Sequence, residues 1–219
     1  MLKKFIMAFV FIGSTISLFG QSKLAFWKKD REYAKNSFTI YTSGPIPPGG
    51  GFSFNHHLNR QTTISAFYGE SEGVDIDPSD AITFGEGDNE TFYYGTLANN
   101  SNWCGLQLNY RPFEKLEGLR VAFGAGVGKL QGALTDSLGA EYRISASGPF
   151  TYMGIGYGLR PVKGLQLGID IGWLTAPTFE VSSDGSHNQT DQFRHAIESD
   201  MNEFFTYIPN LQLTIGWGF

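Results

Sequence analysis

The chain has 219 residues, which is enough for one domain of ordinary size. Charged residues make up 17% of it, aromatic residues make up 15%, and 28 residues are glycine, a composition that suits a β-barrel better than a helical enzyme. The formal net charge of −5 argues against nucleic acid as a partner, because phosphate binding needs a basic surface. Cys104 is the single cysteine, which excludes an internal disulfide framework.

The N-terminus has the pattern of a signal peptide over residues 1–20. Lys3 and Lys4 form a positive start, an apolar run follows over 5–12, and small residues lead to the expected cleavage site after Gly20. The apolar run is shorter than the roughly 20 residues of a transmembrane helix, although an uncleaved helical anchor is the alternative. The basic and polar residues 21–36 are predicted to be a periplasmic segment that precedes the folded part.

From residue 37 onward, apolar residues alternate with small or polar ones. The pattern is clearest near the C-terminus, where Leu213, Ile215 and Trp217 alternate with Thr214 and Gly216. In a strand, such alternation places the apolar side chains on one face and the others on the opposite face. Eight strands are predicted, at 37–43, 51–58, 61–69, 103–111, 119–128, 151–160, 165–173 and 211–219.

The connections between these segments alternate in length. Short ones lie near Asn59 and Arg60 and at 112–118 and 161–164, whereas longer ones lie at 44–50, 70–102, 129–149 and 174–208. Outer-membrane barrels have an even number of strands, short periplasmic turns and longer outer loops. The sequence therefore predicts an all-β fold, a single eight-stranded antiparallel transmembrane β-barrel over 37–219. A soluble β-sandwich is the alternative.

The last strand ends on an aromatic residue, Phe219, with Trp217 two places before it. This ending resembles the C-terminal targeting signal of bacterial outer-membrane proteins, which the barrel-assembly machinery reads. From about residue 37 to 219 the chain resembles the small eight-stranded family typified by the barrel of OmpA and by OmpW, and no motif selects a subfamily. The resemblance implies a place in the bacterial outer membrane, with outer-membrane lipids, lipopolysaccharide and the assembly machinery as partners.

Charges separate between the two predicted ends of the barrel. The three longest loops hold 16 of the 21 acidic residues but only Lys129, Arg143 and Arg194 as bases. Such loops could bind divalent cations that bridge lipopolysaccharide phosphates. Asp75, Asp77 and Asp80 have spacing vaguely like a calcium loop, but they lack the glycine and distal glutamate of an EF-hand. A solvated acidic loop is the preferred interpretation, and no metal or cofactor is predicted.

A network of charged side chains is predicted inside the barrel, from Arg111, Arg120, Arg160 and Asp170. An unpaired ion in a narrow interior is costly, so Asp170 is expected to pair with a lumen arginine or lysine. Eight strands leave an interior that side chains can just fill, which favours a plugged lumen over a gate.

The glycines predicted to face inward leave two interpretations open. On the segments 119–128 and 151–160 they alternate with apolar residues that would face outward. These glycines either make room for inward aromatic rings, with Trp103, Tyr152 and Phe67 as candidates, or they line an open slot.

Three functions are compatible with these features. We favour a structural or surface-interaction barrel without enzymatic activity. The first alternative is a narrow OmpW-like channel for small or hydrophobic solutes. The second is a lipid A-modifying enzyme, for which His187 beside Ser186, and His195 near Glu198 and Ser199, are the candidates, although no matched triad pattern is present. The stretch 193–201 is predicted to form a short amphipathic helix within the last loop.

Overall fold

The computed structural model describes residues 31–45, 49–71, 73–80, 82–84, 91–97, 100–113, 116, 118–137, 139–175, 177–183, 190–204 and 207–219. The predicted signal peptide and most of the predicted segment 21–36 lie outside these residues. The chain divides into two compact units, Met1–Glu32 and Tyr33–Phe219, and every strand and helix of the described residues belongs to the second.

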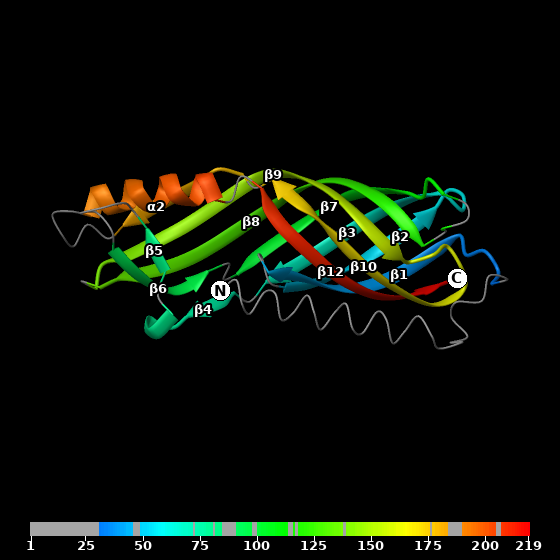
Figure 1. Ribbon diagram of the computed structural model, residues 1–219, viewed down its shortest axis with the longest axis horizontal. Coiled ribbons are helices and arrows are strands. Elements are labelled where there is room, and N and C mark those ends of the chain that lie inside the picture. Colours follow the sequence, from blue (N-terminus) through cyan, green and yellow to red (C-terminus); the bar gives the residue numbers. More distant parts are fainter. Residues whose placement is uncertain are drawn as a thin grey trace. The chain divides into compact units, whose positions relative to one another are not determined.

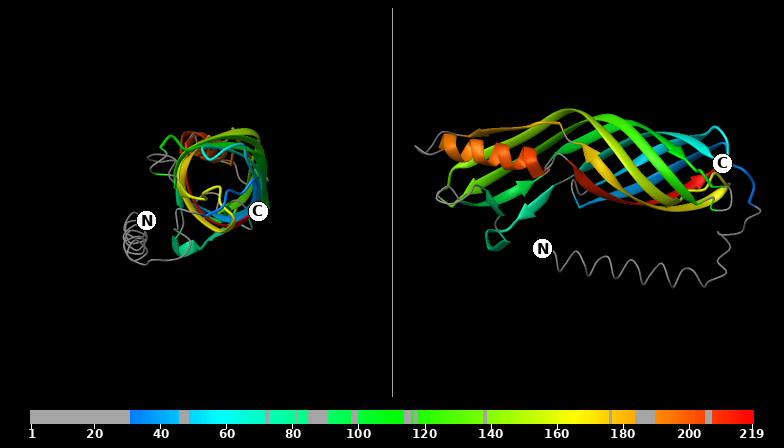
Figure 2. Two further views of the ribbon diagram at one scale, coloured as in Figure 1. Left: turned by 90° about the vertical axis from the view of Figure 1, so that its right-hand side faces the viewer. Right: turned by 45° about the horizontal axis from the view of Figure 1, so that its top comes forward.

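Eight antiparallel strands close into a barrel, which confirms the predicted fold (Figures 1 and 2). They are β1 (Asn36–Pro45), β2 (Gly49–His57), β3 (Thr62–Ser71), β7 (Ser101–Tyr110), β8 (Leu119–Asp136), β9 (Glu141–Gly158), β10 (Gly164–Thr175) and β12 (Ile208–Gly218). Each strand pairs with the next in this order. The last strand, β12, pairs with β1 and closes the ring, so the barrel has no unpaired edge.

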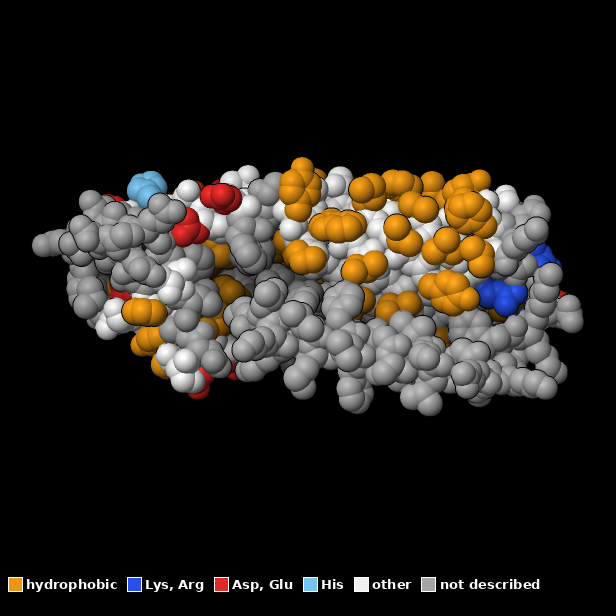
Figure 3. All heavy atoms as spheres, in the orientation of Figure 1, with side chains coloured by type: hydrophobic (Ala, Val, Ile, Leu, Met, Phe, Trp, Pro, Cys, Tyr) orange, Lys and Arg blue, Asp and Glu red, His pale blue; other side chains and the backbone are white. Residues whose placement is uncertain are grey.

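Side chains alternate between the lumen and the outer face along each barrel strand. On β12, Leu213 and Ile215 are each 51% exposed, whereas Thr214 between them is 8% exposed. Figure 3 shows apolar side chains gathered over the outer face of the barrel strands. The barrel therefore has an apolar exterior and a largely polar interior, the reverse of a soluble protein.

The two ends of the barrel differ in their connections. At one end, here called the turn end, β2–β3, β7–β8 and β9–β10 are joined directly by short segments. The barrel closes there through two backbone hydrogen bonds, from Phe219 to Asn36 O at 2.9 Å and from Asn36 to Phe219 O at 3.1 Å. At the opposite end, the loop end, only 46–48 separate β1 from β2, so the predicted loop 44–50 is shorter than expected.

The other loop-end connections, predicted at 70–102, 129–149 and 174–208, are long, and their described residues include further strands and a helix. The paired strands β8 and β9 run on as a long hairpin to Asp136 and Glu141. Further elements are β4 (Val74–Ile76), the 3-10 turn η2 (Pro78–Asp80), β5 (Ile82–Phe84), β6 (Thr91–Leu97), β11 (Phe179–Ser183) and α2 (Thr190–Phe204). The strand β6 pairs with β8, and β11 pairs with β9. Together these elements and the hairpin form the loop-end extension.

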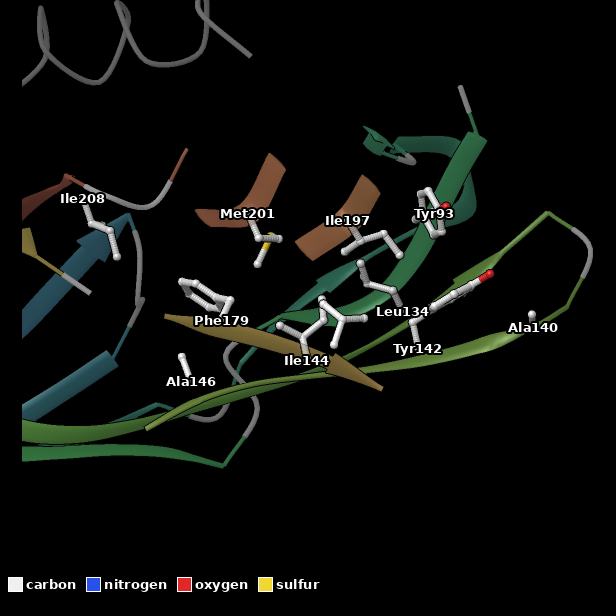
Figure 4. Close-up of a cluster of buried hydrophobic side chains, with 11 residues drawn as sticks. Tyr93, Leu134, Ala140, Tyr142, Ile144, Ala146, Phe179, Ile197, Met201 and Ile208 are labelled. Atoms are coloured by element: carbon white, nitrogen blue, oxygen red, sulfur yellow. The ribbon is translucent and has the colours of Figure 1, made fainter. Parts of the chain in front are cut away.

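The loop-end extension has its own hydrophobic core, shown in Figure 4. Ile197 and Met201 of α2 are buried against Leu134 of β8 and Ile144 of β9. The Asn202 side chain joins α2 to β11, because its Oδ1 accepts from the Phe179 N–H at 2.8 Å and its Nδ2 donates to Phe179 O at 3.2 Å. The predicted helix over 193–201 is therefore present within α2, and a buried face holds it in place.

A buried polar group stabilises the tip of the long hairpin. Asp136 Oδ1 accepts from the Ala140 N–H at 2.9 Å, and Asp136 Oδ2 accepts from Tyr142 Oη at 3.1 Å. The Tyr142 ring packs edge-on against Tyr93, with 5.6 Å between ring centroids. Burial raises the pKa of Tyr93 above its usual range, and the nearby carboxylate of Asp136 adds to this effect.

None of the helices among the described residues combines the length and the hydropathy of a helix that crosses a membrane.

Candidate functional site in the barrel lumen

The barrel encloses a cavity of about 100 Å³. All eight barrel strands contribute to its lining. Toward the loop end the lining reaches Leu130 and Leu174, and toward the turn end it stops at Arg120, Leu159 and Asp170. A complete plug requires side chains to fill the lumen along its whole length, and at this cavity they do not.

Two aromatic residues lie over a pair of glycines on the wall of this cavity. The register places Tyr41 of β1 beside Gly51, Gly51 beside Gly69, and Gly69 beside Trp103 of β7. Trp103 Nε1 donates to Tyr41 Oη at 3.1 Å, and Tyr41 Oη donates to the backbone oxygen of Tyr68 at 3.1 Å. A Cβ at Gly51 would lie 2.7 Å from Tyr41 Oη. The two side chains thus use space that a larger residue at either glycine would occupy.

The same arrangement recurs on the neighbouring strands. Phe67 of β3 pairs with Gly105, Gly105 with Gly126, and Gly126 with Phe150 of β9. The two phenyl rings meet over the glycines with 6.2 Å between their centroids. A Cβ at Gly105 would lie 2.7 Å from Phe67 Cζ, and one at Gly126 would lie 2.7 Å from Phe150 Cζ.

A third aromatic contact covers glycines on β9 and β10. A Cβ at Gly154 would lie 2.8 Å from Cζ of Tyr152. A Cβ at Gly172 would lie 2.7 Å from Cε2 of the same ring. These inward glycines therefore make room for aromatic rings, one of the two interpretations left open by the sequence. Because the rings lie against the wall, open space remains between them.

Two of the four predicted network residues, Arg120 of β8 and Asp170 of β10, form an ion pair. Both lie opposite Gly156 of β9 in the strand register, so the pair spans one intervening strand. Arg120 Nη2 donates to Asp170 Oδ2, and Arg120 Nη1 donates to the backbone oxygen of Gly158 at 2.7 Å. Both side chains are buried, and a Cβ at Gly156 would overlap the Asp170 carboxylate. The pairing is therefore possible only because residue 156 is glycine.

The turn end of the lumen is closed in part by Leu159, a side chain that the alternation alone misplaces. The pattern predicts Leu159 on the outer face, and this prediction is wrong. The strand β9 ends at Gly158, and Gly158 and Leu159 both have positive φ, at 95° and 46°. This left-handed turn brings the Leu159 side chain inward, against Gly168 and into the cavity lining.

Arg111 and Arg160, the other two predicted network residues, are not part of this ion pair. Arg111 Nη1 donates to Thr63 Oγ1 at 3.1 Å, and its Nη2 donates to the backbone oxygen of Leu159 at 2.6 Å. Arg111 thereby ties β3 and β7 to the turn after β9. Arg160 lies in that turn and does not line the cavity.

A hydrogen-bonded polar wall lines the cavity on β1, β2, β3 and β7, and it includes Gln107 and Asn109, whose alternation predicts that they face the lumen. Thr39 Oγ1 and Ser53 Oγ lie 2.6 Å apart, and Asn109 Nδ2 donates to Ser65 Oγ at 3.2 Å. Gln107 Nε2 donates to Asn109 Oδ1 at 3.2 Å. The signal was the hydroxyl and amide residues at alternate positions, which mark a wet or hydrogen-bonded inner face.

His57 and His195 lie in different parts of the molecule. His57 is buried at the turn end, with its Nε2 3.2 Å from Ser37 Oγ and its Nδ1 2.8 Å from Thr63 Oγ1. A hydroxyl therefore orients this ring, in contrast to the carboxylate of a Ser-His-Asp arrangement. His195 is exposed on α2, and His187 lies outside the described residues.

The acidic candidates for a metal site lie on the loop-end extension. Asp75 is exposed on β4 and accepts from Thr96 Oγ1 at 2.9 Å. Asp77 accepts from the backbone N–H and the hydroxyl of Ser79, and these bonds lower the pKa of its carboxyl. The Asp80 side chain lies outside the described part. Among the described residues, no group of three or more acidic, histidine or cysteine side chains is arranged to hold a metal ion.

The two predicted assembly residues face outward at the turn end. Trp217 is 61% exposed on β12, and Phe219 is 55% exposed at its end. Both side chains thus lie on the apolar outer face, while the Phe219 backbone closes the barrel against Asn36.

No known protein family and no curated protein matches the chain by sequence. Among solved structures it is similar to CarO of Acinetobacter baumannii, with 16% identity, a TM-score of 0.54, and coverage of 87% of this chain and 100% of CarO. CarO2 of the same species gives 14% identity and a TM-score of 0.55 over 86% of this chain and 100% of CarO2. A major outer membrane protein of Thermus thermophilus gives 14% identity and a TM-score of 0.49, over 84% of this chain and 99% of that protein.

At identities this low, the structural similarity establishes a shared fold alone. The chain therefore has the fold of the small eight-stranded outer-membrane β-barrel proteins, as its sequence predicts.

Proposed function

We propose that the protein is an outer-membrane β-barrel that holds its folded loop-end extension outside the cell, as a structural or surface-interaction protein. The apolar outer face of the barrel carries this proposal. Large apolar side chains such as Ile40, Leu106 and Ile155 are 54–62% exposed around the barrel. A continuous face of this kind is unfavourable in water, and the hydrocarbon core of a bilayer removes that cost.

Charge and connection length support an orientation with the turn end in the periplasm. Acidic side chains lie on the loop-end extension, and basic ones lie near the turn end (Figure 3). In this proposal the signal peptide 1–20 directs export and is cleaved after Gly20, and the barrel-assembly machinery reads the strand that ends in Phe219. Outer-membrane lipids surround the barrel, and lipopolysaccharide lies next to the extension.

Fractionation and surface digestion test this location together. The protein is expected in the outer-membrane fraction, and its band on unheated gels should shift on heating, as closed barrels often do. Protease added to intact cells should cut within the loop-end extension and leave the barrel. Recovery in the soluble periplasm, or cleavage only in lysed cells, would contradict the proposal.

The surface-interaction role rests on the extension having a defined shape. Its elements pack on a buried hydrophobic core, and Phe92 of β6 and Tyr207 before β12 are exposed. The proposal includes no catalytic role, because His57 is enclosed at the turn end and His195 lies on the exposed side of α2.

A narrow channel is the second candidate, and the cavity is the observation that favours it. A channel needs a continuous water path, whereas Arg120, Asp170, Arg111 and Leu159 occupy the turn end of the lumen. We therefore expect at most a weak conductance in planar bilayers. Changing Arg120 and Asp170 together to alanine should raise it. Stable ion-selective steps from the unchanged protein would establish a pore and overturn the closed-lumen proposal.

A further inference from the structure

We propose that the cavity above the Arg120–Asp170 pair is a binding site for an uncharged sugar, entered from the loop end. The cavity is closed toward the turn end by this ion pair and by Leu159, and its lining continues to residues at the loop ends of the strands. The inference depends on the closed barrel and its lining, and it does not require the outward role of the loop-end extension.

The charges of the lining exclude a charged ligand. Among the described residues, 25 line the cavity, and of these only Arg120 and Asp170 carry a charge and form an ion pair with each other. An anion or cation placed here would lose its hydration without gaining a free counter-charge. The ligand is therefore neutral.

The polar groups of the lining disfavour a purely apolar ligand. Twelve of the 25 residues are serine, threonine, asparagine or glutamine, among them Thr39, Gln107 and Asn210. Tyr152 Oη and Asn210 Oδ1 have no hydrogen-bond partner among the described residues. A hydrocarbon would displace water from these groups without replacing its hydrogen bonds, whereas a ligand rich in hydroxyls replaces them.

The aromatic residues select a ligand that also has flat apolar faces. Tyr41, Phe67, Trp103 and Phe150 all line the cavity, and the contacts over the glycine pairs hold their rings against the wall. A sugar ring presents C–H groups on its faces and hydroxyls around its edge. It can therefore pack on an aromatic face while it forms hydrogen bonds to the polar wall.

Trp103 offers a direct probe, because it is the tryptophan that lines the cavity. Changing Trp27, Trp173 and Trp217 to phenylalanine leaves its indole as the single tryptophan fluorophore. With this folded variant in detergent micelles, we expect a saturable change in Trp103 fluorescence with glucose, maltose or lactose in the millimolar range. Glucuronate, glucosamine and hexane-1,6-diol should give at least tenfold weaker binding.

Two adjacent residues of β3 provide a matched test of the site. Ser65 faces the cavity and accepts from Asn109, whereas Ala66 faces outward. Ser65→Leu should weaken sugar binding at least tenfold, and Ala66→Leu should leave it unchanged. Heat-shift gels establish first that each variant folds, and Ser65→Ala, with an expected smaller loss, replaces Ser65→Leu if the leucine prevents folding.

Each outcome decides the proposal. Saturable binding of a neutral sugar that Ser65→Leu weakens and Ala66→Leu does not supports it. The absence of a saturable response to any neutral sugar overturns it, because the cavity then holds only water. Equal binding of glucuronate, glucosamine or hexane-1,6-diol also overturns it. Because the assay uses purified protein, its result is separate from the fractionation and surface-digestion tests of location.

Discussion

At the residue scale, glycine determines which large side chains can lie along the lumen wall. Gly156 sits between Arg120 and Asp170 in the strand register, and its missing Cβ leaves the space in which the two ions meet. Gly51 and Gly69 do the same for Tyr41 and Trp103. The glycines thus position the polar and aromatic groups of the lumen, which offsets their lower intrinsic preference for strands.

We predict that Gly156→Ala destabilises the barrel by breaking the buried ion pair. The added Cβ would overlap the Asp170 carboxylate and lie 3.0 Å from Arg120 Cζ, so it forces the two charges apart and leaves both uncompensated. Removing one partner of a buried ion pair costs about 3–5 kcal/mol, and separating the two is expected to cost a similar amount. The free energy of unfolding, measured by urea titration in lipid vesicles, should fall by an amount in this range. Gly44→Ala is the control, because nothing lies within 4 Å of a Cβ at Gly44. Equal stability of the two variants would show that the pair does not depend on Gly156.

At the element scale, the two faces of each strand have opposite chemistry. On β12, Leu213 lies on the apolar outer face, and Gln212 beside it lines the cavity. In the loop-end extension, α2 has one face buried, where it contacts β11 and joins the same hydrophobic cluster as Leu134 and Ile144 of the long hairpin. Each of these two elements therefore needs a different environment on each of its two faces: β12 lies between the outer face and the lumen, and α2 lies between packed protein and water.

The facing of β12 predicts different effects of arginine at two adjacent positions. Leu213→Arg should lower the free energy of unfolding in vesicles by about 2–4 kcal/mol, because arginine would lie near the middle of the bilayer. Gln212→Arg should lower it less than Leu213→Arg, because its side chain enters the lumen, where polar groups can accept its hydrogen bonds. Similar losses at the two positions in a refolding titration would contradict the membrane-facing assignment.

The separate core of the loop-end extension predicts a local effect of α2 substitutions. Ile197 is fully buried, and Ile197→Ala should cost about 2–5 kcal/mol within the extension. Limited proteolysis should then cut the extension faster, while the heat shift of the barrel remains. His195→Ala on the exposed side of α2 is the control. Loss of the heat shift in Ile197→Ala would mean that the barrel and the extension fold as one unit.

At the scale of the whole molecule, the barrel exists only if its first and last strands meet. Pairing of β1 with β12 extends from Ser37 with Gly218 to Pro45 with Asn210, and Phe219 adds two backbone hydrogen bonds to Asn36. An open edge in hydrocarbon would leave unpaired N–H and C=O groups, each costing several kcal/mol. Closure is therefore a requirement for insertion.

We predict that Phe219→Asp reduces assembly in cells much more than it reduces the stability of protein that has already folded. The charged residue disturbs the apolar end of β12, which both closes the barrel and, in our proposal, is read by the assembly machinery. Surface levels measured by protease digestion of intact cells should fall, whereas refolding in vesicles should change little. Phe219→Tyr is the control, and normal surface levels of Phe219→Asp would exclude an assembly role for this residue.

The sequence by itself determined the eight barrel strands, their facing and the closed fold, but neither the extension of β8 and β9 beyond the predicted segments nor the strands β4, β5, β6 and β11. Period-two alternation places Leu213 outward and Thr214 inward whatever the neighbouring strand is, because the side chains of a strand point alternately to its two faces. The amphipathic helix at 193–201 was likewise readable from local spacing. Alternation failed only where the backbone left the strand, as at Leu159, whose positive φ turns it into the lumen.

Only the tertiary structure decided which side chains of different strands lie next to one another. The pairing of Arg120 with Asp170, and of Phe67 with Phe150, depends on the register of three or four strands at once, and no single segment encodes that register. The loop-end extension likewise depends on pairing between β6 and β8 and between β9 and β11, which brings together residues far apart in the chain. The cavity follows from these contacts, because aromatic rings that could have crossed the lumen lie instead on glycines of adjacent strands.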